Sequence, residues 1–544
     1  MVEAYFVFPK DLVPSGHDIS AHTTYSRIFI DALKQGQFPV RWVEHVWPGH
    51  SQPLFNFYQV GFYYFVSLVN VFTGSVTESI KLATLFFWGL GAFFMFLWMK
   101  RFGTLAAILS ALVFVFSPYL ILDIFVRAAF PEFAAITLIL GIFWALDRKR
   151  FFTLSLLTGL AIITHLPTFV IFAPIIAVYA LLNRKNIVLI ILSFILGIGL
   201  SSFYLLPAIF EQQFINIDNL RSGNFDFHKH FVYPQQLITY VWGYGGSTQG
   251  LNDNMSFQVG LIQWTILALS LLILIKIAAL SASWRIARND VIARSQTTKQ
   301  SKQGSKGTPW KAAYLSLFLL ASFFGLFMMM ETSTPVWETF KFLQFLQFPW
   351  RYFMIISFST AVLSGLLLSL VKKTSLASAI VFIVSITVLY LYSAYLKPEE
   401  WLPKDYYSDE NIKVRGYFEP GYNPLGVEQV PTQEIPRYQA NQDTQVQELL
   451  LKDNQLKLSI NTPKPFVLTI NSHFFPGWKV YIDEKETKIT PSKSYWFLEI
   501  EVPEGKHIVE AKFTDTPVRV LANQISLGTV LGLLIVFLGY PKKP

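Results

Sequence analysis

Apolar segments separated by short charged loops dominate the chain from residue 79 to residue 396, and one more lies near its end. A run of about 20 apolar residues is long enough for a helix to cross a bilayer. The pattern therefore predicts an α-helical polytopic membrane protein with about 11–12 spans. The predicted spans are 79–99, 104–121, 130–146, 152–164, 168–182, 186–207, 257–279, 312–330, 353–371, 375–396 and 521–539.

The Lys and Arg residues gather in alternate loops. Cytoplasmic loops of membrane proteins carry an excess of these residues, so the basic loops are predicted to be cytoplasmic and the others extracytoplasmic. An outward-facing first loop needs a spanning helix ahead of it, and we expect one upstream. The predicted cytoplasmic loops are 100–101, 147–150, 183–185, 280–311, 372–373 and the basic tail 541–544. The predicted outer regions are 1–78, 122–129, 165–167, 208–256, 331–352 and 397–520.

The first outer region, 1–78, carries an amphipathic pattern but no clear span. From Ile19 onward, apolar residues recur at three- and four-residue spacing, which predicts a helix. Gly36 and Pro39 are expected to end it. Residues 54–72 are apolar but rich in Tyr and Phe, which predicts an interfacial or re-entrant helix. The residues expected on the buried face of the first helix are Tyr25, Ile28, Phe29, Ala32 and Leu33.

The second outer region, 397–520, reads as a soluble domain before the final span and basic tail, 521–544. From about residue 450, apolar and polar residues alternate, as in strands with one buried face. Pro476-Gly477 and Pro503-Glu504-Gly505 predict turns. We therefore predict a C-terminal extracytoplasmic β-sandwich. Its expected strands surround Leu456–Ile460, Val467–Ile470, Trp478–Ile482, Trp496–Val502 and Ile508–Ala511.

Composition supports this class and excludes others. Only 15% of residues are charged, against about 25% in soluble domains. The net charge of +9 comes largely from the topogenic loops, so we expect no nucleic-acid partner. The chain has no cysteine, which excludes disulfides and thiolate chemistry. No phosphate-binding glycine loop or zinc-hydrolase motif occurs, which argues against nucleotide hydrolysis.

Asp18 is the first candidate for chemistry. It lies between His17 and His22, just ahead of the predicted helix. A carboxylate in this setting can act as a general base on a hydroxyl group, or the three residues can hold a divalent cation such as Mg²⁺ or Mn²⁺. The alternative is that Asp18 only caps the helix.

A second set of candidates lies at the predicted outer ends of the spans. Arg127 could bind a phosphate, or it could form an ion pair with Glu132 that joins two helices. His165 separates two short apolar segments, and broken helices often line binding sites in membrane proteins. The alternative is a histidine that only forms hydrogen bonds within a helix turn. Arg351 could contact a lipid phosphate or anchor an aromatic belt.

Several motifs resemble a prokaryotic membrane family labelled "6-pyruvoyl-tetrahydropterin synthase-related", and more widely the glycosyltransferase-C superfamily. The label itself is misleading, because nothing here matches the soluble zinc synthase. The C-terminal motifs His473–Val480 and Pro503–His507 resemble the outer β-domain of YfhO-like members. The N-terminal motifs are Gly16-His17-Asp18 with His22 and Arg27, Gly36–Trp42, Pro53–Tyr58, Arg127–Glu132 and Thr164-His165-Leu166.

The resemblance implies a glycosyltransferase of the cell envelope in the prokaryotic cytoplasmic membrane. Its donor would be a polyprenyl-phosphate sugar, its acceptor an extracytoplasmic glycan, lipid or protein, and Asp18 its catalytic base. Two other functions stay open: a transporter or flippase of a lipid-linked glycan, and a structural envelope protein. The residues implied as substrate or donor contacts are His22, Arg41, Arg127, Glu132, His165 and Arg351.

Overall fold

The computed structural model describes residues 9, 12–47, 49–182, 184–294, 309–407, 417 and 419–539. Among these residues, eight helices are long and apolar enough to cross a membrane, and one bent pair can make a ninth. Three shorter apolar helices accompany them. The chain is thus a multi-span helical membrane protein, as predicted.

Every predicted span falls on a helix, although the lengths differ. The segment 104–121 is broken into two helices bent by 44°, with Ser117 and Pro118 at the break. The predicted break at His165 is also present, between two of the shorter apolar helices. Part of the predicted cytoplasmic loop 280–311 instead continues a helix to Arg294, while 295–308 and the tail 541–544 lie outside the described residues. The helices are α5 (Val76–Met99), α6 (Thr104–Val115), α7 (Pro118–Phe125), α8 (Phe130–Arg148), α9 (Phe151–Thr164), α10 (Leu166–Leu182), α11 (Ile187–Phe210), α13 (Leu261–Arg294), α14 (Pro309–Met329), α16 (Phe353–Leu368), α17 (Thr374–Tyr392) and α19 (Pro517–Gly539).

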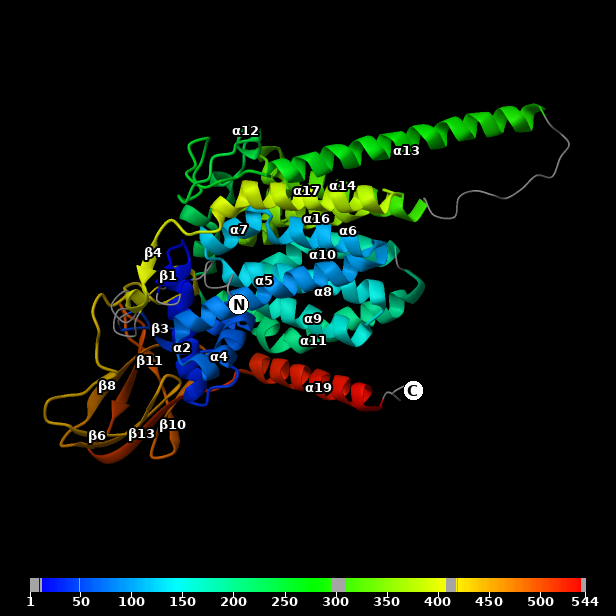
Figure 1. Cartoon of the computed structure of the whole chain (residues 1–544). Coiled ribbons are helices and arrows are strands. Elements are labelled where there is room, and N and C mark those ends of the chain that lie inside the picture. The colour runs from blue at the N-terminus through cyan, green and yellow to red at the C-terminus, as the bar shows by residue number, and fades with distance from the viewer. Residues whose placement is uncertain are drawn as a thin grey trace.

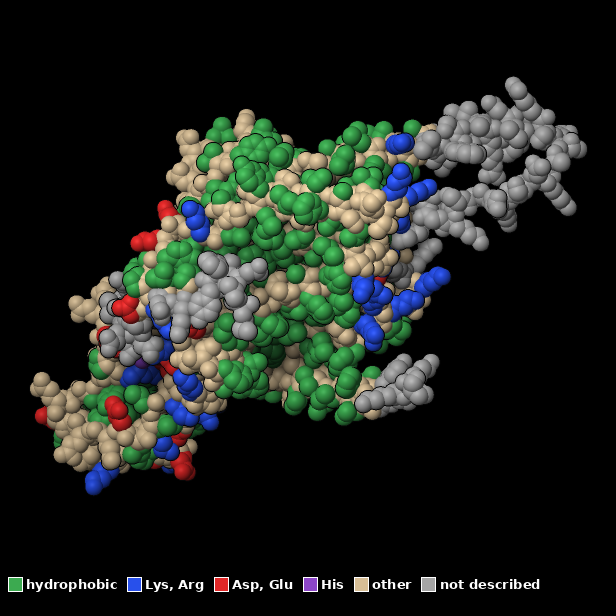
Figure 2. Space-filling model, viewed as in Figure 1, with side chains coloured by type: hydrophobic (Ala, Val, Ile, Leu, Met, Phe, Trp, Pro, Cys, Tyr) green, Lys and Arg blue, Asp and Glu red, His purple; other side chains and the backbone are tan. Residues whose placement is uncertain are grey.

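Several basic loops meet at one end of the helical bundle. Arg101, after α5, forms an ion pair with Asp147 at the end of α8. Lys311, at the start of α14, donates to the backbone carbonyl of Ser369 at the end of α16, 3.2 Å away. Figure 2 shows blue Lys and Arg side chains gathered at the end of the bundle opposite the β-domain. These basic loops thus lie together at one end of the bundle, and the side of the membrane that this end faces stays a prediction.

The N-terminal region lies at the other end of the bundle, between the helices and the β-domain (Figure 1). Helix α2 (Ile19–Lys34) begins where the apolar spacing predicted, and Gly36 ends it with a positive φ of 87°. Helices α3 (Leu54–Phe57) and α4 (Gly61–Thr73) follow. The 13 residues of α4 are fewer than a span requires. A short strand, β1 (Leu12–Pro14), pairs with β4 (Trp401–Pro403), so the region also contacts the segment that follows α17.

The C-terminal domain is a β-sandwich of one five-stranded and one four-stranded antiparallel sheet, in the orders β10-β9-β13-β7-β6 and β11-β12-β8-β5. Alternating apolar residues from both sheets, among them Leu458, Leu468 and Val509, share one buried core. The strands predicted from alternation correspond to β7, β8, β9, β12 and β13. The domain's strands are β5 (Tyr438–Gln439), β6 (Gln445–Lys452), β7 (Gln455–Thr462), β8 (Phe466–His473), β9 (Trp478–Ile482), β10 (Lys485–Thr487), β11 (Thr490–Pro491), β12 (Phe497–Val502) and β13 (Gly505–Phe513).

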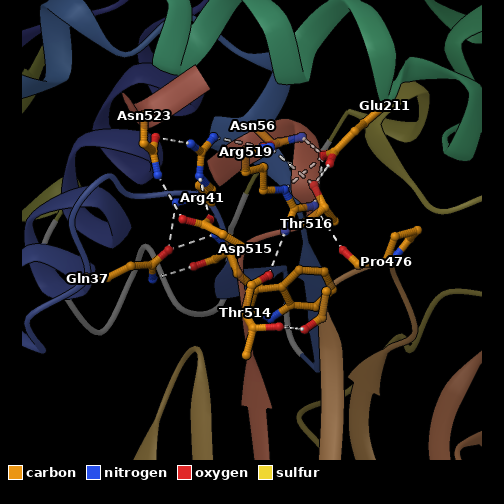
Figure 3. A network of polar contacts seen from close by, with 12 residues as sticks. Gln37, Arg41, Asn56, Glu211, Pro476, Thr514, Asp515, Thr516, Arg519 and Asn523 are labelled. Atoms are coloured by element: carbon orange, nitrogen blue, oxygen red, sulfur yellow. Dashed lines mark hydrogen bonds and ion pairs between the residues drawn. The ribbon is translucent and has the colours of Figure 1, made fainter. Parts of the chain in front are cut away.

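A buried polar network fixes this sandwich to the helices (Figure 3). Glu211, at the end of α11, accepts a hydrogen bond from Asn56 in α3 at 2.7 Å. The same carboxylate pairs with Arg519 of α19 at 2.8 Å. Arg519 also donates to the carbonyls of Thr514 and Pro476, which belong to the sandwich end. The N-terminal region, α11, α19 and the sandwich therefore meet at the ion pair of Glu211 and Arg519.

Candidate functional site

A cavity of about 500 Å³ lies where the N-terminal region meets the helical bundle. Its walls include six of the residues singled out from the sequence, and these come from four separated parts of the chain. Such concave sites with a few convergent polar groups are typical of ligand-binding sites. The six residues are Asp18, His22, Arg127, Glu132, His165 and Arg351.

Asp18 is positioned by its backbone and leaves its carboxylate available to the cavity. The residue precedes α2, yet its side chain makes no capping hydrogen bond. Its backbone N–H instead donates to the carbonyl of Arg127 at 2.8 Å. This bond holds the start of α2 against the turn between α7 and α8. Because the Asp18 side chain accepts no hydrogen bond from the first turn of α2, its alternative role as a helix cap does not fit the geometry.

His22 lies one turn further along α2 and is only 2% exposed. Its Nδ1 contacts the Tyr63 hydroxyl at 2.7 Å. Burial lowers the pKa of His22 to about 4, an effect opposed by the negative charge of Asp18. A neutral imidazole at this position can accept a hydrogen bond at one ring nitrogen and donate one from the other, without carrying a charge.

The two arginines of the cavity belong to one ion-pair cluster. Arg127 contacts Asp123 and pairs with Glu132 at 3.0 Å, and its guanidinium lies over the Trp350 ring at 4.4 Å. Arg351 donates from Nε to the other oxygen of Glu132 at 3.0 Å. The helix-joining ion pair of Arg127 and Glu132 therefore forms, and Asp123 and Arg351 extend it into a cluster. Because the cluster also lines the cavity, it presents fixed N–H donors suited to an oxyanion.

His165 lies at the break between α9 and α10 and is buried. Its Nδ1 contacts the Thr168 hydroxyl at 2.7 Å, and it accepts from the Thr168 backbone N–H at 3.2 Å. With Nδ1 engaged by the following turn, the ring is held in one orientation beside Glu132. The break thus places a polar group at the cavity wall, as the sequence pattern suggested.

The predicted cation site does not assemble. His17 is exposed and its Nε2 contacts the backbone carbonyl of Tyr244 at 2.8 Å, away from His22. Within the ranges that the structure describes, no group of three or more His, Cys, Asp or Glu residues could hold a metal ion. The His17, Asp18 and His22 set predicted for Mg²⁺ or Mn²⁺ is corrected accordingly, because the helix start turns the first imidazole outward.

Arg41 also lies apart from the cavity-lining residues. Its guanidinium donates to Asn56 at 3.1 Å and Asn523 at 2.8 Å, and pairs with Asp515 at 3.4 Å. Burial lowers the pKa of Arg41 to about 10, and Asp515 opposes the shift. Figure 3 shows Arg41 within the network that fixes the sandwich. Arg41 therefore belongs to this interface network, and its contact with the donor stays a prediction.

The cavity includes further polar residues that were not predicted as site residues. Glu419 and four tyrosines also line it, and two of the tyrosines come from the segment between α17 and the sandwich. Burial raises the pKa of Glu419 to about 7. This segment lacks any periodic pattern, so its only sequence signal was a local richness in Tyr and Pro. The tyrosines are Tyr25, Tyr58, Tyr417 and Tyr422.

Comparisons with known proteins give little beyond these observations. No protein-family model matches the chain, and no curated protein matches it. The structure is similar to the crystal structure of ArnT from Cupriavidus metallidurans bound to undecaprenyl phosphate, with 13% sequence identity and a TM-score of 0.30. The match covers 67% of this chain and 75% of that one. A TM-score this low carries no argument for fold or function.

Proposed function

We propose that the chain is a membrane glycosyltransferase of the glycosyltransferase-C type, which moves a sugar from a polyprenyl-phosphate donor to an acceptor hydroxyl on the outer face. The observation that carries the proposal is the cavity that joins a carboxylate without a capping partner, Asp18, to the arginine cluster of Arg127 and Arg351. The motif resemblance, which implied the same residues, supports it.

The lining of the cavity suits a donor with a lipid tail. Beside the arginine cluster, the wall is apolar and comes from α10, α11 and the loop before α16. An isoprenoid chain could lie against this wall while its phosphate reaches the guanidinium groups. The apolar residues include Leu166, Pro167, Val170, Ile209, Phe342 and Phe345.

The reaction can be assigned to residues of the cavity. The Asp18 carboxylate accepts the proton of the acceptor hydroxyl as that oxygen bonds to the anomeric carbon of the sugar. The bond between the anomeric carbon and the phosphate oxygen breaks, and its electron pair leaves with the polyprenyl phosphate. Arg127 and Arg351 stabilise the charge that develops on this phosphate. Direct displacement of this kind inverts the anomeric configuration.

The test is transfer of radiolabelled sugar from synthetic polyprenyl-phosphate donors to a membrane glycan extract, by purified wild type and by Asp18→Asn. Loss of a general base typically lowers the rate by about 10²- to 10⁴-fold. Asp31→Asn is the matched control, because Asp31 lies on the same helix but pairs with Arg27 at 2.8 Å. Undiminished transfer by Asp18→Asn would remove Asp18 as the base. Transmembrane movement of the lipid-linked sugar without any transfer would favour the flippase instead.

A further inference from the structure

The wall of the cavity that carries Tyr25, Tyr58, Tyr417 and Tyr422 has no part in the reaction as assigned above. The ring centroids of Tyr25 lie 5.1 Å from Tyr58 and 5.9 Å from Tyr417, and Tyr58 lies 5.9 Å from Tyr422. All these contacts are edge-to-face. The four rings therefore form one continuous cluster around part of the cavity.

Two polar features of this cluster point to a ligand. The Tyr25 side chain is 1% exposed, and within the described part of the chain its hydroxyl has no hydrogen-bond partner. Buried hydroxyls are nearly always paired, so an orphan one on a cavity wall marks a position for a ligand's polar group. Glu419, also on this wall, hydrogen-bonds Tyr417 and, among the described residues, forms no ion pair with Lys or Arg.

Asp18 lies close to this cluster as well as to the arginines. Asp18 acts electrostatically on His22 together with Arg127, which places it near the cation cluster. It also acts on Tyr417: after the larger effect of burial, Glu419 and Asp18 both raise the pKa of that hydroxyl. Asp18 is therefore close both to the group suited to a donor phosphate and to the group formed by the tyrosines and Glu419.

We propose that Tyr25, Tyr58, Tyr417, Tyr422 and Glu419 form the acceptor subsite, and that the acceptor is a carbohydrate. The inference rests on the proposed function, because it assigns the acceptor hydroxyl to the tyrosine wall, next to the Asp18 carboxylate that would take its proton. Sugars present C–H faces that pack on aromatic rings and adjacent hydroxyls that need both donors and acceptors. The tyrosine rings supply the first, and the Tyr25 hydroxyl with the Glu419 carboxyl supplies the second.

The Glu419 carboxyl fits this role for a further reason. With a pKa of about 7, it is present in both its protonated and ionised forms near neutral pH, so it can donate to one sugar hydroxyl or accept from another. It reaches the cavity from the segment that leads to the β-sandwich. The outer domain would thereby contribute directly to acceptor recognition.

The test is binding of the full-length, detergent-solubilised protein to an array of immobilised oligosaccharides with hexose, deoxyhexose, uronic acid and N-acetylhexosamine ends. Wild type should bind at least one of these classes. Tyr25→Phe and Glu419→Gln should each weaken that binding about 3- to 10-fold, the effect of losing one hydrogen bond. Because the Tyr25 hydroxyl is unpaired without ligand, Tyr25→Phe should unfold at the same or a higher temperature than wild type.

Matched controls separate local from general effects. Tyr64→Phe alters a tyrosine that does not line the cavity. Glu448→Gln alters a glutamate that contacts a tyrosine hydroxyl, Tyr438, at 3.1 Å on the exposed sandwich surface. Neither change should affect binding.

The outcomes also separate this proposal from the proposed transfer. Asp18→Asn should bind saccharide like wild type while failing to transfer. Saccharide binding that depends on Tyr25 and Glu419, without any transfer, would support the subsite and overturn the transferase. Absence of binding to every saccharide, or equal binding by all variants, would overturn the carbohydrate subsite even if transfer to another acceptor is found.

Discussion

Replacement of Arg519 by Met should sharply destabilise the attachment of the β-sandwich to the helices. The Arg519 side chain is fully buried, and its partner Glu211 is 3% exposed. The guanidinium donates to Glu211 from Nε at 2.9 Å and to the carbonyl of Pro476 at 2.9 Å. Its removal leaves a buried carboxylate supported only by Asn56 and Thr516. Removing one partner of such a pair costs about 3–5 kcal/mol.

The double variant provides the sharper test of this reasoning. Glu211→Leu alone leaves the Arg519 guanidinium buried without its counter-charge. It should therefore also lower the free energy of unfolding by about 3–5 kcal/mol. When both residues are replaced, no buried charge is left unpaired, so the combined loss should be about 0–2 kcal/mol rather than the sum. Replacement of both partners of a buried pair by apolar residues is often close to neutral.

The assay is unfolding of the detergent-solubilised protein followed by tryptophan fluorescence. Trp42 and Trp478 report on this interface, because their rings lie 5.3 Å apart and both pack on Phe513, over which the Arg519 guanidinium lies. Arg221→Met is the control, since its pair with Asp218 is solvent-exposed and should be worth under about 1 kcal/mol. The account would be refuted if the single variants lost no more unfolding free energy than the Arg221→Met control. It would also be refuted if the double variant lost as much as the two single variants together.

Two further predictions concern the cavity and the pH response of the domain interface. Arg351→Gln should raise the KM for a polyprenyl-phosphate sugar by about tenfold or more, because Arg351 lies on the cavity wall. Arg221→Gln should leave the KM unchanged, because Arg221 does not line the cavity. Equal KM values for the two variants would exclude a phosphate contact. Burial lowers the pKa of His50 to about 4, and His473, whose Nε2 contacts His50 Nδ1 at 2.7 Å, is shifted in the same direction. An unfolded chain protonates its histidines near pH 6.5, whereas His50 stays neutral in the folded protein down to about pH 4. The free energy of unfolding should therefore have its full value above pH 6.5 and fall by on the order of 3 kcal/mol toward pH 4. Melting temperatures measured across this range should fall less steeply in His50→Gln, and an unchanged slope would contradict the assignment.

Local patterns predicted much of the architecture. Apolar runs located the helices, and the spacing of Tyr25 and Phe29 located α2, because both signals depend only on neighbouring residues and on burial. Alternation likewise found five sandwich strands. It missed β6, whose sequence Gln-Val-Gln-Glu-Leu-Leu-Leu-Lys breaks the two-residue period and lies at a sheet edge with many exposed side chains.

The candidate site was predictable only in part, because its residues are joined by tertiary contacts. Arg127 and Glu132 were adjacent enough in sequence to be read as a pair, but the link from Glu132 to Arg351 spans 219 residues. Arg41 was assigned to the donor from its motif, whereas its partner Asn523 lies 482 residues away. Glu419 lies in a segment without a periodic pattern, marked only by its richness in Tyr and Pro, and tertiary contacts such as the hydrogen bond from Gln52 to its backbone carbonyl hold it in place.

The central claim is that one cavity holds the donor with its phosphate at the arginine cluster and its sugar beside Asp18. The most direct test is an electron cryomicroscopy structure of the Asp18→Asn protein with a polyprenyl-phosphate sugar. The account predicts phosphate density within hydrogen-bond distance of Arg127 or Arg351 and the sugar between it and the Tyr25–Glu419 wall. Phosphate density on the tyrosine side of Asp18, or a lipid-linked sugar bound outside the cavity, would contradict it.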